Sequence, residues 1–525
     1  MNITIRTKYL VFASSRSAQR KRLCFAFRGK PVYELDVKLQ NETPDFYAYI
    51  DVSRFLGMEL SLTCEGAEPV FRESDGMDLP GLYCEEYRPQ VHFTTRNGWI
   101  NDPNGLVRLG GEYHMFYQHN PAGTEWGNMH WGHAVSRDLA KWQEKDIALF
   151  PDETGMMFSG CCFVDDRNRL GLQQGDDPTA ILYYTATKPF AQYMAVSGDR
   201  FKTICKYRPE PVVPPIGSTE SRDPKVIWCD ELSCYLMALY VTADAYTLYR
   251  SDDLVHWEHF WDYRLEGEEE LPDILIFTVA DGTNRYVFTS NTDHYIVMRM
   301  QDGAFVPEGG MKALFHGSRN HAPVSFSNSP DGRCVRMIWI PFDGARYGMP
   351  FSGQLSTLDY SLDCVDGQYY LAAQPVRELE TLYETSVLHQ PVDVTEEGFC
   401  APLADAAHLI RLKGSMPENT LVEISILGVP FEIDPAANEF RRADGSSRCP
   451  LCVTGHSLDI TLLIDRCSFE VFANGGKSCM YGLIPKGMMD RKSPCIRLRT
   501  RTGRCTLDTL ETHALRSIWE SSAHH

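Results

Sequence analysis

The chain has 525 residues, of which 43% are hydrophobic and 11% aromatic, enough for two or three domains with cores of their own. The formal net charge of −19 disfavours nucleic acid and anionic membranes as partners and suits a neutral ligand. We read no signal peptide and no membrane span, and the seventeen cysteines lack regular spacing, so we expect a cytoplasmic protein with reduced thiols.

Residues 1–85 contain short runs of alternating apolar and polar residues, at 23–27, 33–37 and 47–52, separated by turn signals. This pattern predicts a small β-sandwich. The segment holds no group of reactive side chains. We therefore expect an accessory domain that is either structural or sugar-binding.

Residues 86–375 carry a weak internal repeat. The sequence SRDLAKW at 136–142 recurs as SDDLVHW at 251–257, with a fainter copy, SGDRF, at 197–201. Each copy follows a β-rich run, and a unit of about 50 to 60 residues is the size of a propeller blade, so about five blades fit here. A chance match of short Ser-x-Asp segments is the alternative.

The pattern changes again over residues 380–520. Strands with strict alternation are expected at 421–426, 458–464 and 468–472, and the last is followed by a hairpin signal at Asn474-Gly475-Gly476. These features predict a C-terminal β-sandwich.

The most informative stretch is NDPNG at 101–105, which follows the aromatic Trp99. Pro103 fixes its own φ and pushes Asp102 toward an extended backbone, while the Asn-Gly pair after it tolerates left-handed φ. The sequence therefore predicts a tight turn with the Asp102 carboxylate at its lip, and Trp99 is a candidate sugar platform. An Asx-turn that only caps a loop is the alternative.

Two further acidic sites stand out. Asp223 precedes Pro224 at the entry to a β-like run, and the segment 268–273 has four acids in six positions. Crowded like charges make it costly to ionise every member, so one of them is expected to stay protonated near neutrality, as a general acid requires. A solvated acidic loop is the alternative.

Two motifs have the residue types of metal sites. His130 and His133 have ligand spacing only on a helix, whereas their glycine and aromatic neighbours predict a strand or a turn. Cys449 and Cys452 form a CxxC motif that has no second pair nearby. We expect no metal and no cofactor.

Taken together and in this order, the motifs resemble glycoside hydrolase family 32, the β-fructosidases, which include invertases, inulinases and levanases. The resemblance is carried by WINDPNG at 99–105, YHMFYQHNP at 113–121, WGNMHWGHA at 126–134, FSG at 158–160, RDP at 222–224, and Glu270 with Pro272-Asp273. It implies an all-β protein: a five-bladed β-propeller with the active site in a central funnel, followed by a β-sandwich, here with a small N-terminal β domain.

The resemblance also implies roles for individual residues. Asp102 corresponds to the nucleophile, Asp223 to the transition-state stabiliser that holds the sugar hydroxyls, and Glu270 to the acid/base. The positions that line the fructose pocket in the family correspond to Asn101, Gln118, Trp126, Phe158, Ser159 and Arg222. A retaining glycosidase needs two carboxyl groups about 5–5.5 Å apart. Because Arg222 and Asp223 are adjacent, a regular strand would point them in opposite directions unless the turn before Pro224 relaxes this.

Three positions depart from the family pattern. Leu271 stands where the family usually has Cys, Cys161 where it usually has Ser, and Thr357-Leu358-Asp359 where it tends to have Leu-Pro-Arg. These departures concern the tuning of Glu270 and the leaving-group side of the pocket, with Glu269 as the less favoured acid.

The resemblance implies a hydrolase that releases terminal, non-reducing β-D-fructofuranosyl residues from fructans, fructo-oligosaccharides or sucrose through a covalent fructosyl-enzyme. The context of Asn128-Met129-His130 is more similar to fructan hydrolases than to sucrose-6-phosphate hydrolases. A fructosyltransferase of the same fold and a non-catalytic fructan-binding protein are the alternatives. Linkage preference, chain length and oligomeric state stay open.

Overall fold

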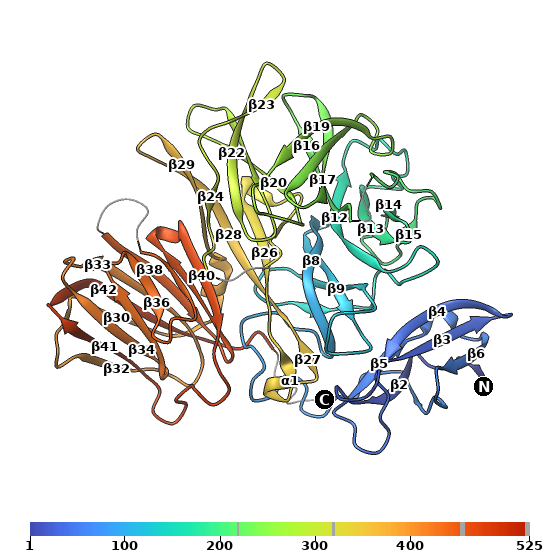
Figure 1. The fold of residues 1–525 in the computed structure, drawn as a ribbon, viewed down its shortest axis with the longest axis horizontal. Coiled ribbons are helices and arrows are strands. Elements are labelled where there is room, and N and C mark those ends of the chain that lie inside the picture. The colour runs from blue at the N-terminus through green and yellow to red at the C-terminus, as the bar shows by residue number, and fades with distance from the viewer. Residues whose placement is uncertain (218–219, 318–320, 452–456, 520–525) are drawn as a thin grey trace.

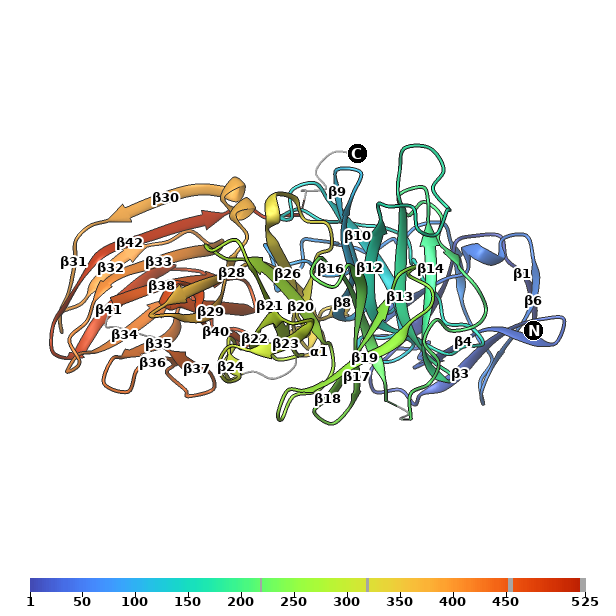
Figure 2. The same cartoon turned by 90° about the horizontal axis from the view of Figure 1, so that it is seen from above.

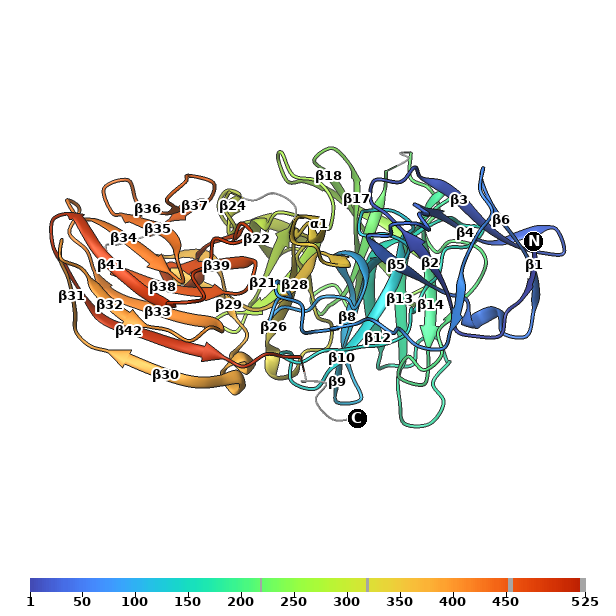
Figure 3. The ribbon, with the colours of Figure 1, turned by 90° about the horizontal axis from the view of Figure 1, so that it is seen from below.

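The computed structural model describes residues 1–217, 220–317, 321–451 and 457–519, and within these residues the protein is built almost wholly of β-strands. A central propeller lies between a small N-terminal domain and a C-terminal sandwich, which occupy opposite ends of the molecule in all three views (Figures 1, 2 and 3). The all-β prediction, with a five-bladed propeller and a sandwich, is confirmed. Over the described ranges, no helix is both long enough and apolar enough to cross a membrane.

The N-terminal domain consists of two antiparallel sheets. Its strands are β1 (Asn2–Thr4), β2 (Tyr9–Ser14), β3 (Lys21–Phe27), β4 (Lys30–Val37), β5 (Phe46–Asp51), β6 (Glu59–Cys64) and β7 (Arg72–Ser74), with the short 3-10 turn η1 (Ser53–Phe55). One sheet has the order β1-β6-β3-β4 and the other β5-β2-β7. The inward apolar residues, such as Phe12, Leu23 and Leu62, form one core. That core also takes in Ala122 from the propeller, so the two domains share buried surface.

The propeller has five antiparallel sheets, each meandering outward from an innermost strand. The strands are β8 (Gly98–Leu109), β9 (Glu112–Asn120), β10 (His130–Ser136) and β11 (Gln143–Glu144) in blade one; β12 (Met157–Asp165), β13 (Thr179–Thr187), β14 (Phe190–Ser197) and β15 (Cys205–Lys206) in blade two; β16 (Arg222–Cys229), β17 (Cys234–Thr242), β18 (Ala245–Ser251) and β19 (Glu258–Arg264) in blade three; β20 (Asp273–Thr278), β21 (Asn284–Thr289), β22 (His294–Gln301), β23 (Ala304–Pro307) and β24 (Lys312–Ala313) in blade four; and β25 (Val324–Ser325), β26 (Cys334–Ile340), β28 (Gln354–Val365) and β29 (Gln368–Pro375) in blade five. In blade five, the 3-10 turn η2 (Pro330–Gly332) lies between β25 and β26. The short helix α1 (Gly344–Tyr347) and β27 (Phe351–Ser352) lie between β26 and β28. β27 pairs in parallel with β8 and so ties blade five to blade one.

The Ser-x-Asp repeat marks equivalent places in three consecutive blades. Ser136, Ser197 and Ser251 are the last residues of the third strands β10, β14 and β18. Each hydroxyl donates a hydrogen bond to the aspartate two residues later, at 3.1, 3.0 and 3.1 Å. The repeat is therefore structural rather than a chance match, since it caps the same strand end each time.

The predicted turn at 101–105 is wrong. The chain remains in strand β8 through this stretch, and its register with β9 shifts once before Pro103 and again after Asn104. Two β-bulges thus absorb the proline, which has no N–H for the ladder, and Gly105, whose φ is 53°. The turn-forming residues bend and twist the strand without ending it.

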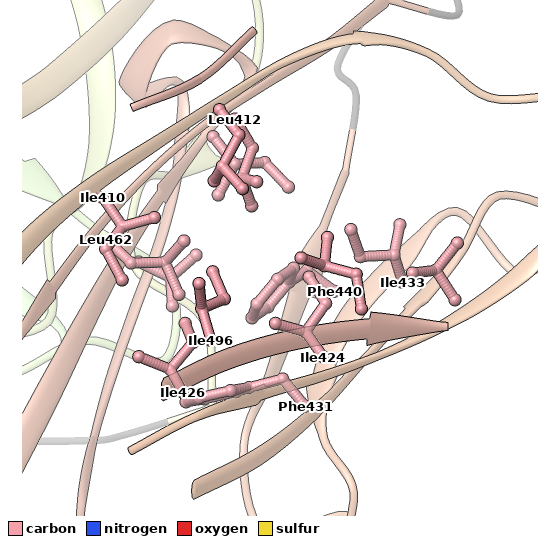
Figure 4. Packing of buried hydrophobic residues seen from close by; sticks show 14 of the residues in the cluster. Ile410, Leu412, Ile424, Ile426, Phe431, Ile433, Phe440, Leu462 and Ile496 are labelled. Atoms are coloured by element: carbon pink, nitrogen blue, oxygen red, sulfur yellow. The ribbon is translucent and has the colours of Figure 1, made fainter. Parts of the chain in front are cut away.

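The C-terminal domain is a sandwich of two large sheets. Its strands are β30 (Tyr383–His389), β31 (Val392–Val394), β32 (Phe399–Pro402), β33 (Ala407–Ser415), β34 (Leu421–Ile426), β35 (Val429–Asp434), β36 (Glu439–Arg442), β37 (Arg448–Pro450), β38 (Ser457–Ile464), β39 (Ser468–Ala473), β40 (Ser478–Leu483), β41 (Cys495–Thr502) and β42 (Cys505–Leu515), with 3-10 turns η3 (Arg377–Leu382) and η4 (Asn474–Gly476). The sheet orders are β30-β42-β33-β38-β39-β40, with β31 on β42, and β32-β41-β34-β35-β36-β37. Alternate residues of both sheets, such as Leu462 and Phe431, meet in a fully buried core (Figure 4).

A buried ionic group joins the propeller to the sandwich. His92 Nδ1 lies 2.8 Å from Asp465 and its Nε2 lies 2.7 Å from Glu470, and all three residues are buried. Burial alone would lower the pKa of His92, but the hydrogen bonds and charges of the two carboxylates raise it to about 10. A protonated imidazole therefore bridges the two domains.

Candidate active site

The predicted site residues lie on or beside the innermost strands of neighbouring blades. Asn101 and Asp102 are on β8, Phe158 and Ser159 on β12, Arg222 and Asp223 at the start of β16, and Glu270 and Leu271 just before β20. These strands contact one another in order, β8 with β12, β12 with β16, and β16 with β20. Residues far apart in the sequence are thereby brought to one place on the propeller axis.

Asp102 accepts one hydrogen bond on each carboxylate oxygen. Ser159 Oγ donates to Oδ2 at 2.6 Å and Asn101 Nδ2 donates to Oδ1 at 3.0 Å. Trp99 Nε1 in turn donates to Asn101 Oδ1 at 2.9 Å, and the Trp99 ring packs edge-on against Trp339 at 5.7 Å. The indole thus orients the amide that binds the carboxylate.

Burial raises the pKa of Asp102 to about 6, and the nearby charge of Glu270 adds to this effect. The hydrogen bonds from Ser159 and Asn101 act in the opposite direction, because they favour the ionised form. With a pKa of about 6, Asp102 is mostly ionised at neutral pH and becomes protonated in mildly acidic solution.

Glu270 is held from two sides. Arg222 donates to its Oε1 at 2.6 Å and Asn291 Nδ2 donates to its Oε2 at 3.1 Å, while the side chain keeps 37% of its exposure. The Arg222 guanidinium also lies over the ring of Tyr240, 4.6 Å from its centroid. The carboxyl group is thus fixed in orientation and still open to a ligand.

Asp223 is almost fully buried, with 5% exposure, and lies beside the same arginine. Its Oδ2 is 3.7 Å from Arg222 Nε and accepts a hydrogen bond from the Leu271 backbone N–H at 3.1 Å. Burial raises its pKa to about 7; Arg222 opposes this shift, whereas the charges of Glu270 and Asp102 reinforce it. The three carboxyl groups are therefore electrostatically coupled.

The backbone at Asp223 explains why two adjacent side chains meet. Its φ is 64°, in the left-handed region, and the register with β17 shifts between Arg222 and Lys225. The opposite directions expected of a regular strand are lost, and both side chains reach the Glu270-Leu271 segment: Arg222 binds the Glu270 carboxylate and Asp223 binds the Leu271 N–H. Left-handed backbone is uncommon at non-glycine residues, and aspartate is one of the residue types that tolerate it.

The acidic run at 268–273 does not act as one cluster. Glu268 is bound by Ser290, Thr292 and His294, and Asp273 by Lys225, Ser325 and Arg336, whereas Glu269 is exposed. Burial would raise the pKa of Glu268, but the bonds from His294, Ser290 and Thr292 outweigh it and lower that pKa. Glu268 and Asp273 are thus bound by separate sets of partners, and the four acids do not share one site.

The remaining predicted residues surround the carboxylates at different depths. Gln118 is buried, and its Nε2 donates to the Met157 carbonyl at 2.9 Å, beside Phe158 and Ser159. Trp126 lies on the loop 121–129, is 49% exposed, and meets the edge of the Phe158 ring at 6.0 Å. Trp126 is thus the rim residue of the group.

The two departures nearest the carboxylates have structural roles. Leu271 supplies its backbone N–H to Asp223, a contact that its side-chain identity does not alter. The Cys161 sulfur accepts a hydrogen bond from the Val226 N–H at 3.2 Å and so links β12 to β16. Between Ser159 and this cysteine, a Cβ on Gly160 would lie 2.0 Å from the Tyr183 carbonyl oxygen, so glycine is required there.

Sequence reasoning missed several contributors to the site. Asn291 stands in the turn between β21 and β22, and Tyr240 at the far end of β17; neither lies in a motif. The Leu271 contact is made by the backbone, which leaves no trace in residue type. The WINDPNG motif did flag Trp99, but as a sugar platform and not as the partner of Asn101.

The two candidate metal motifs have other partners. His130 Nε2 lies 2.7 Å from Tyr33 Oη in the N-terminal domain, and His133 Nε2 lies 3.1 Å from His114 Nδ1. Cys452 of the CxxC motif lies outside the described residues. Within the ranges that the structure covers, no three His, Cys, Asp or Glu side chains form a metal-binding group.

The structure thus brings three carboxyl groups together: Asp102 with its two hydrogen-bond donors, Glu270 bound by Arg222, and Asp223 beside the same arginine. Glycosidases of the paired-carboxylate type use carboxyl groups gathered in this way. Residues 92–357 match the model of the glycosyl hydrolases family 32 N-terminal domain. The chain belongs to this family, as the motifs indicated, and it is a β-fructosidase by class.

Individual relatives agree with this assignment. The chain is 28% identical over 493 residues to a levanase of Bacillus subtilis, covering 83% of this chain and 72% of the levanase. It is 29% identical over 472 residues to an invertase of Schizosaccharomyces pombe, covering 78% and 79% of the two chains.

Solved structures show the same fold. An exo-inulinase from Aspergillus awamori superposes with a TM-score of 0.71 at 22% identity, covering 85% of this chain and all of that one. A fructofuranosidase from Schwanniomyces occidentalis complexed with fructose gives a TM-score of 0.72 at 21% identity, covering 84% of this chain and 100% of that one.

Proposed function

We propose that this protein hydrolyses terminal, non-reducing β-D-fructofuranosyl residues from fructans, fructo-oligosaccharides or sucrose, with retention of configuration. The names of its relatives support fructose-containing substrates, since they include levanases, an invertase and an exo-inulinase. The solved complexes with fructose and with 1-kestose support the same substrate class.

The observation that carries the proposal is the unlike environment of the two carboxyl groups. Asp102 accepts a hydrogen bond on each oxygen and is ionised at neutral pH, as a nucleophile must be. Glu270 is oriented by Arg222 and Asn291 and remains partly exposed, as a proton donor to a leaving group must be.

In the proposed first step, Asp102 attacks the anomeric carbon of fructose while Glu270 donates its proton to the departing oxygen. In the second step, Glu270 removes a proton from water, and the water displaces Asp102 from the sugar. The buried Asp223 binds sugar hydroxyls, where an interaction that strengthens in the transition state lowers the barrier.

A direct assay follows free fructose after incubation with sucrose, kestose, inulin and levan. Asp102→Asn and Glu270→Gln should each lower turnover by several orders of magnitude, because each removes a group that acts on the reacting atoms. Near-normal fructose release by either variant would reject the role assigned to that residue.

The same assay separates the alternatives. A fructosyltransferase would give longer or cyclised fructans at high substrate concentration in place of free fructose. A non-catalytic fructan-binding protein would show calorimetric binding with no release of reducing sugar.

A further inference from the structure

The N-terminal domain grips the loop that carries Trp126. The matched family model begins at residue 92, so this domain lies outside it. The loop 121–129 connects β9 to β10 and contains two glycines, and it has no regular secondary structure of its own. Its conformation therefore depends on what packs against it.

One end of the loop is anchored by burial. Ala122 is 2% exposed and belongs to the hydrophobic core of the N-terminal domain. At the other end Asn128, with φ of 48°, exchanges two hydrogen bonds of 2.8 Å with the backbone of Asp36 on β4. The following strand begins at His130, which is bonded to Tyr33 of the same domain.

The middle of the loop is held by charge. Glu125, the residue before Trp126, accepts a hydrogen bond from Arg20 at 3.0 Å on one oxygen and from Lys38 at 2.8 Å on the other. Arg16 donates to Thr124 Oγ1 at 3.1 Å and also to the Met349 carbonyl of the blade-five segment before β27. The domain thus fixes the two residues that directly precede Trp126.

Trp126 lies between the contacts made by the N-terminal domain and the candidate active site. Trp126 is 49% exposed and its ring contacts that of Phe158, while Ser159, which follows Phe158, donates to Asp102. A shallow pocket beside the indole is lined by Arg16, Arg20, Lys38 and Phe46 of the N-terminal domain together with Glu125 of the loop. The N-terminal domain therefore contacts the loop that carries Trp126 and forms one wall of the pocket beside the indole.

We propose that the N-terminal domain positions substrate, because its Arg20 and Lys38 hold Glu125 and thereby fix Trp126 at the mouth of the site. Arg20 and Lys38 are positioning residues, which act through Trp126. The inference rests on the proposed function only in taking Trp126 as a contact for a fructose-containing oligosaccharide. Of the two roles expected for this accessory domain, structural or sugar-binding, the proposal gives it a structural role that acts on the binding site.

The test uses the full chain with Arg20→Ala and Lys38→Ala combined. Because two partly exposed ion pairs are lost, KM for kestose should rise by about three- to tenfold, with kcat within about twofold of the parent. The conservative pair Arg20→Lys and Lys38→Arg should restore most of the affinity. The matched control is Lys8→Ala, which breaks the Lys8–Asp146 ion pair between the same two domains, away from the pocket beside Trp126.

Two results would overturn the inference. One is an unchanged KM in the double variant, and the other is an equal rise in the Lys8→Ala control, which would indicate general loosening of the domain. A third comparison tests whether the effect of Arg20 and Lys38 depends on Trp126: in a Trp126→Ala background the double substitution should change KM by less than about 1.5-fold. Full additivity with Trp126→Ala would also contradict the inference.

Calorimetry with kestose on the Glu270→Gln background separates this inference from the proposed hydrolysis. Weaker binding after Arg20 and Lys38 are replaced would support the positioning role even if the parent protein released no fructose. Fructose release by the parent with equal binding in both proteins would reject the positioning role and leave the hydrolysis intact.

Discussion

Replacing Ser159 by alanine removes the shorter of the two hydrogen bonds to Asp102, the 2.6 Å bond to Oδ2. A hydrogen bond to a charged acceptor contributes about 1.5–3 kcal/mol. One pKa unit corresponds to about 1.4 kcal/mol, so the pKa of Asp102 should rise by about one to two units. Starting from about 6 in the parent protein, it should reach the range of neutral to mildly alkaline pH.

The assay is the pH profile of kcat/KM for Ser159→Ala with sucrose or kestose. At about pH 5 the variant should be about ten- to hundredfold less active than the parent, because fewer molecules carry ionised Asp102, and the gap should narrow as pH rises toward 9. Ser197→Ala, which removes the hydroxyl that binds Asp199 at the end of β14, serves as the control with an unchanged profile. A loss of equal size at every pH would refute the reasoning, since Ser159 would then act on substrate and not on Asp102.

Two stability predictions follow from the buried ionisable groups. The pKa of Asp223 rises on folding from 3.8 to about 7, so the folded state binds more protons and the parent loses stability as pH rises through that window. Asp223→Asn lacks this loss, so its melting temperature should exceed that of the parent at pH 8 and approach it near pH 4; the same difference at both values would contradict the assignment. The pKa of His92 is instead raised from 6.5 to about 10, so its stabilisation is full below pH 6.5 and is lost as pH rises through 10. His92→Gln should lower the unfolding free energy by about 3–5 kcal/mol at neutral pH, because it leaves two buried carboxylates without their cation. Denaturant titration at pH 7 and pH 10 checks this, and a variant as stable as the parent at pH 7 would show that the bridge contributes nothing.

Much of the fold is readable from the sequence because it depends on local pattern. Alternating strands require residues of alternating polarity, and the Ser-x-Asp segments recur because the third strand of three blades ends in the same hydrogen-bonded cap. The course of β8 is not readable in this way. The NDPNG sequence has turn chemistry, but its pairing with β9, at Pro103 and Asn104, keeps it within a bulged strand.

In the candidate site, too, residues that stand in motifs can be predicted from the sequence, whereas isolated residues and backbone groups cannot. Asp102, Asp223 and Glu270 stand in motifs with Ser159 and Arg222, so the sequence alone predicts that these residues lie together, as the structure shows. The contacts of Asn291 and of the Leu271 N–H cannot be predicted in this way. Asn291 is an ordinary turn residue, and Leu271 acts through its backbone. The shared direction of Arg222 and Asp223 depends on a left-handed φ at a non-glycine residue, which composition does not reveal.

In the proposed mechanism, Asp102 forms a covalent bond to the fructosyl group, while Glu270 donates a proton to the leaving group and later removes one from water. The most direct measurement is mass spectrometric peptide mapping of Glu270→Gln, quenched with acid during turnover of a β-fructofuranoside whose aryl leaving group departs without protonation. We predict an added anhydrohexose on the peptide that contains Asp102, absent when Asp102→Asn is introduced as well. Release of the aryl group with no adduct, or an adduct on Asp223 in place of Asp102, would contradict the account.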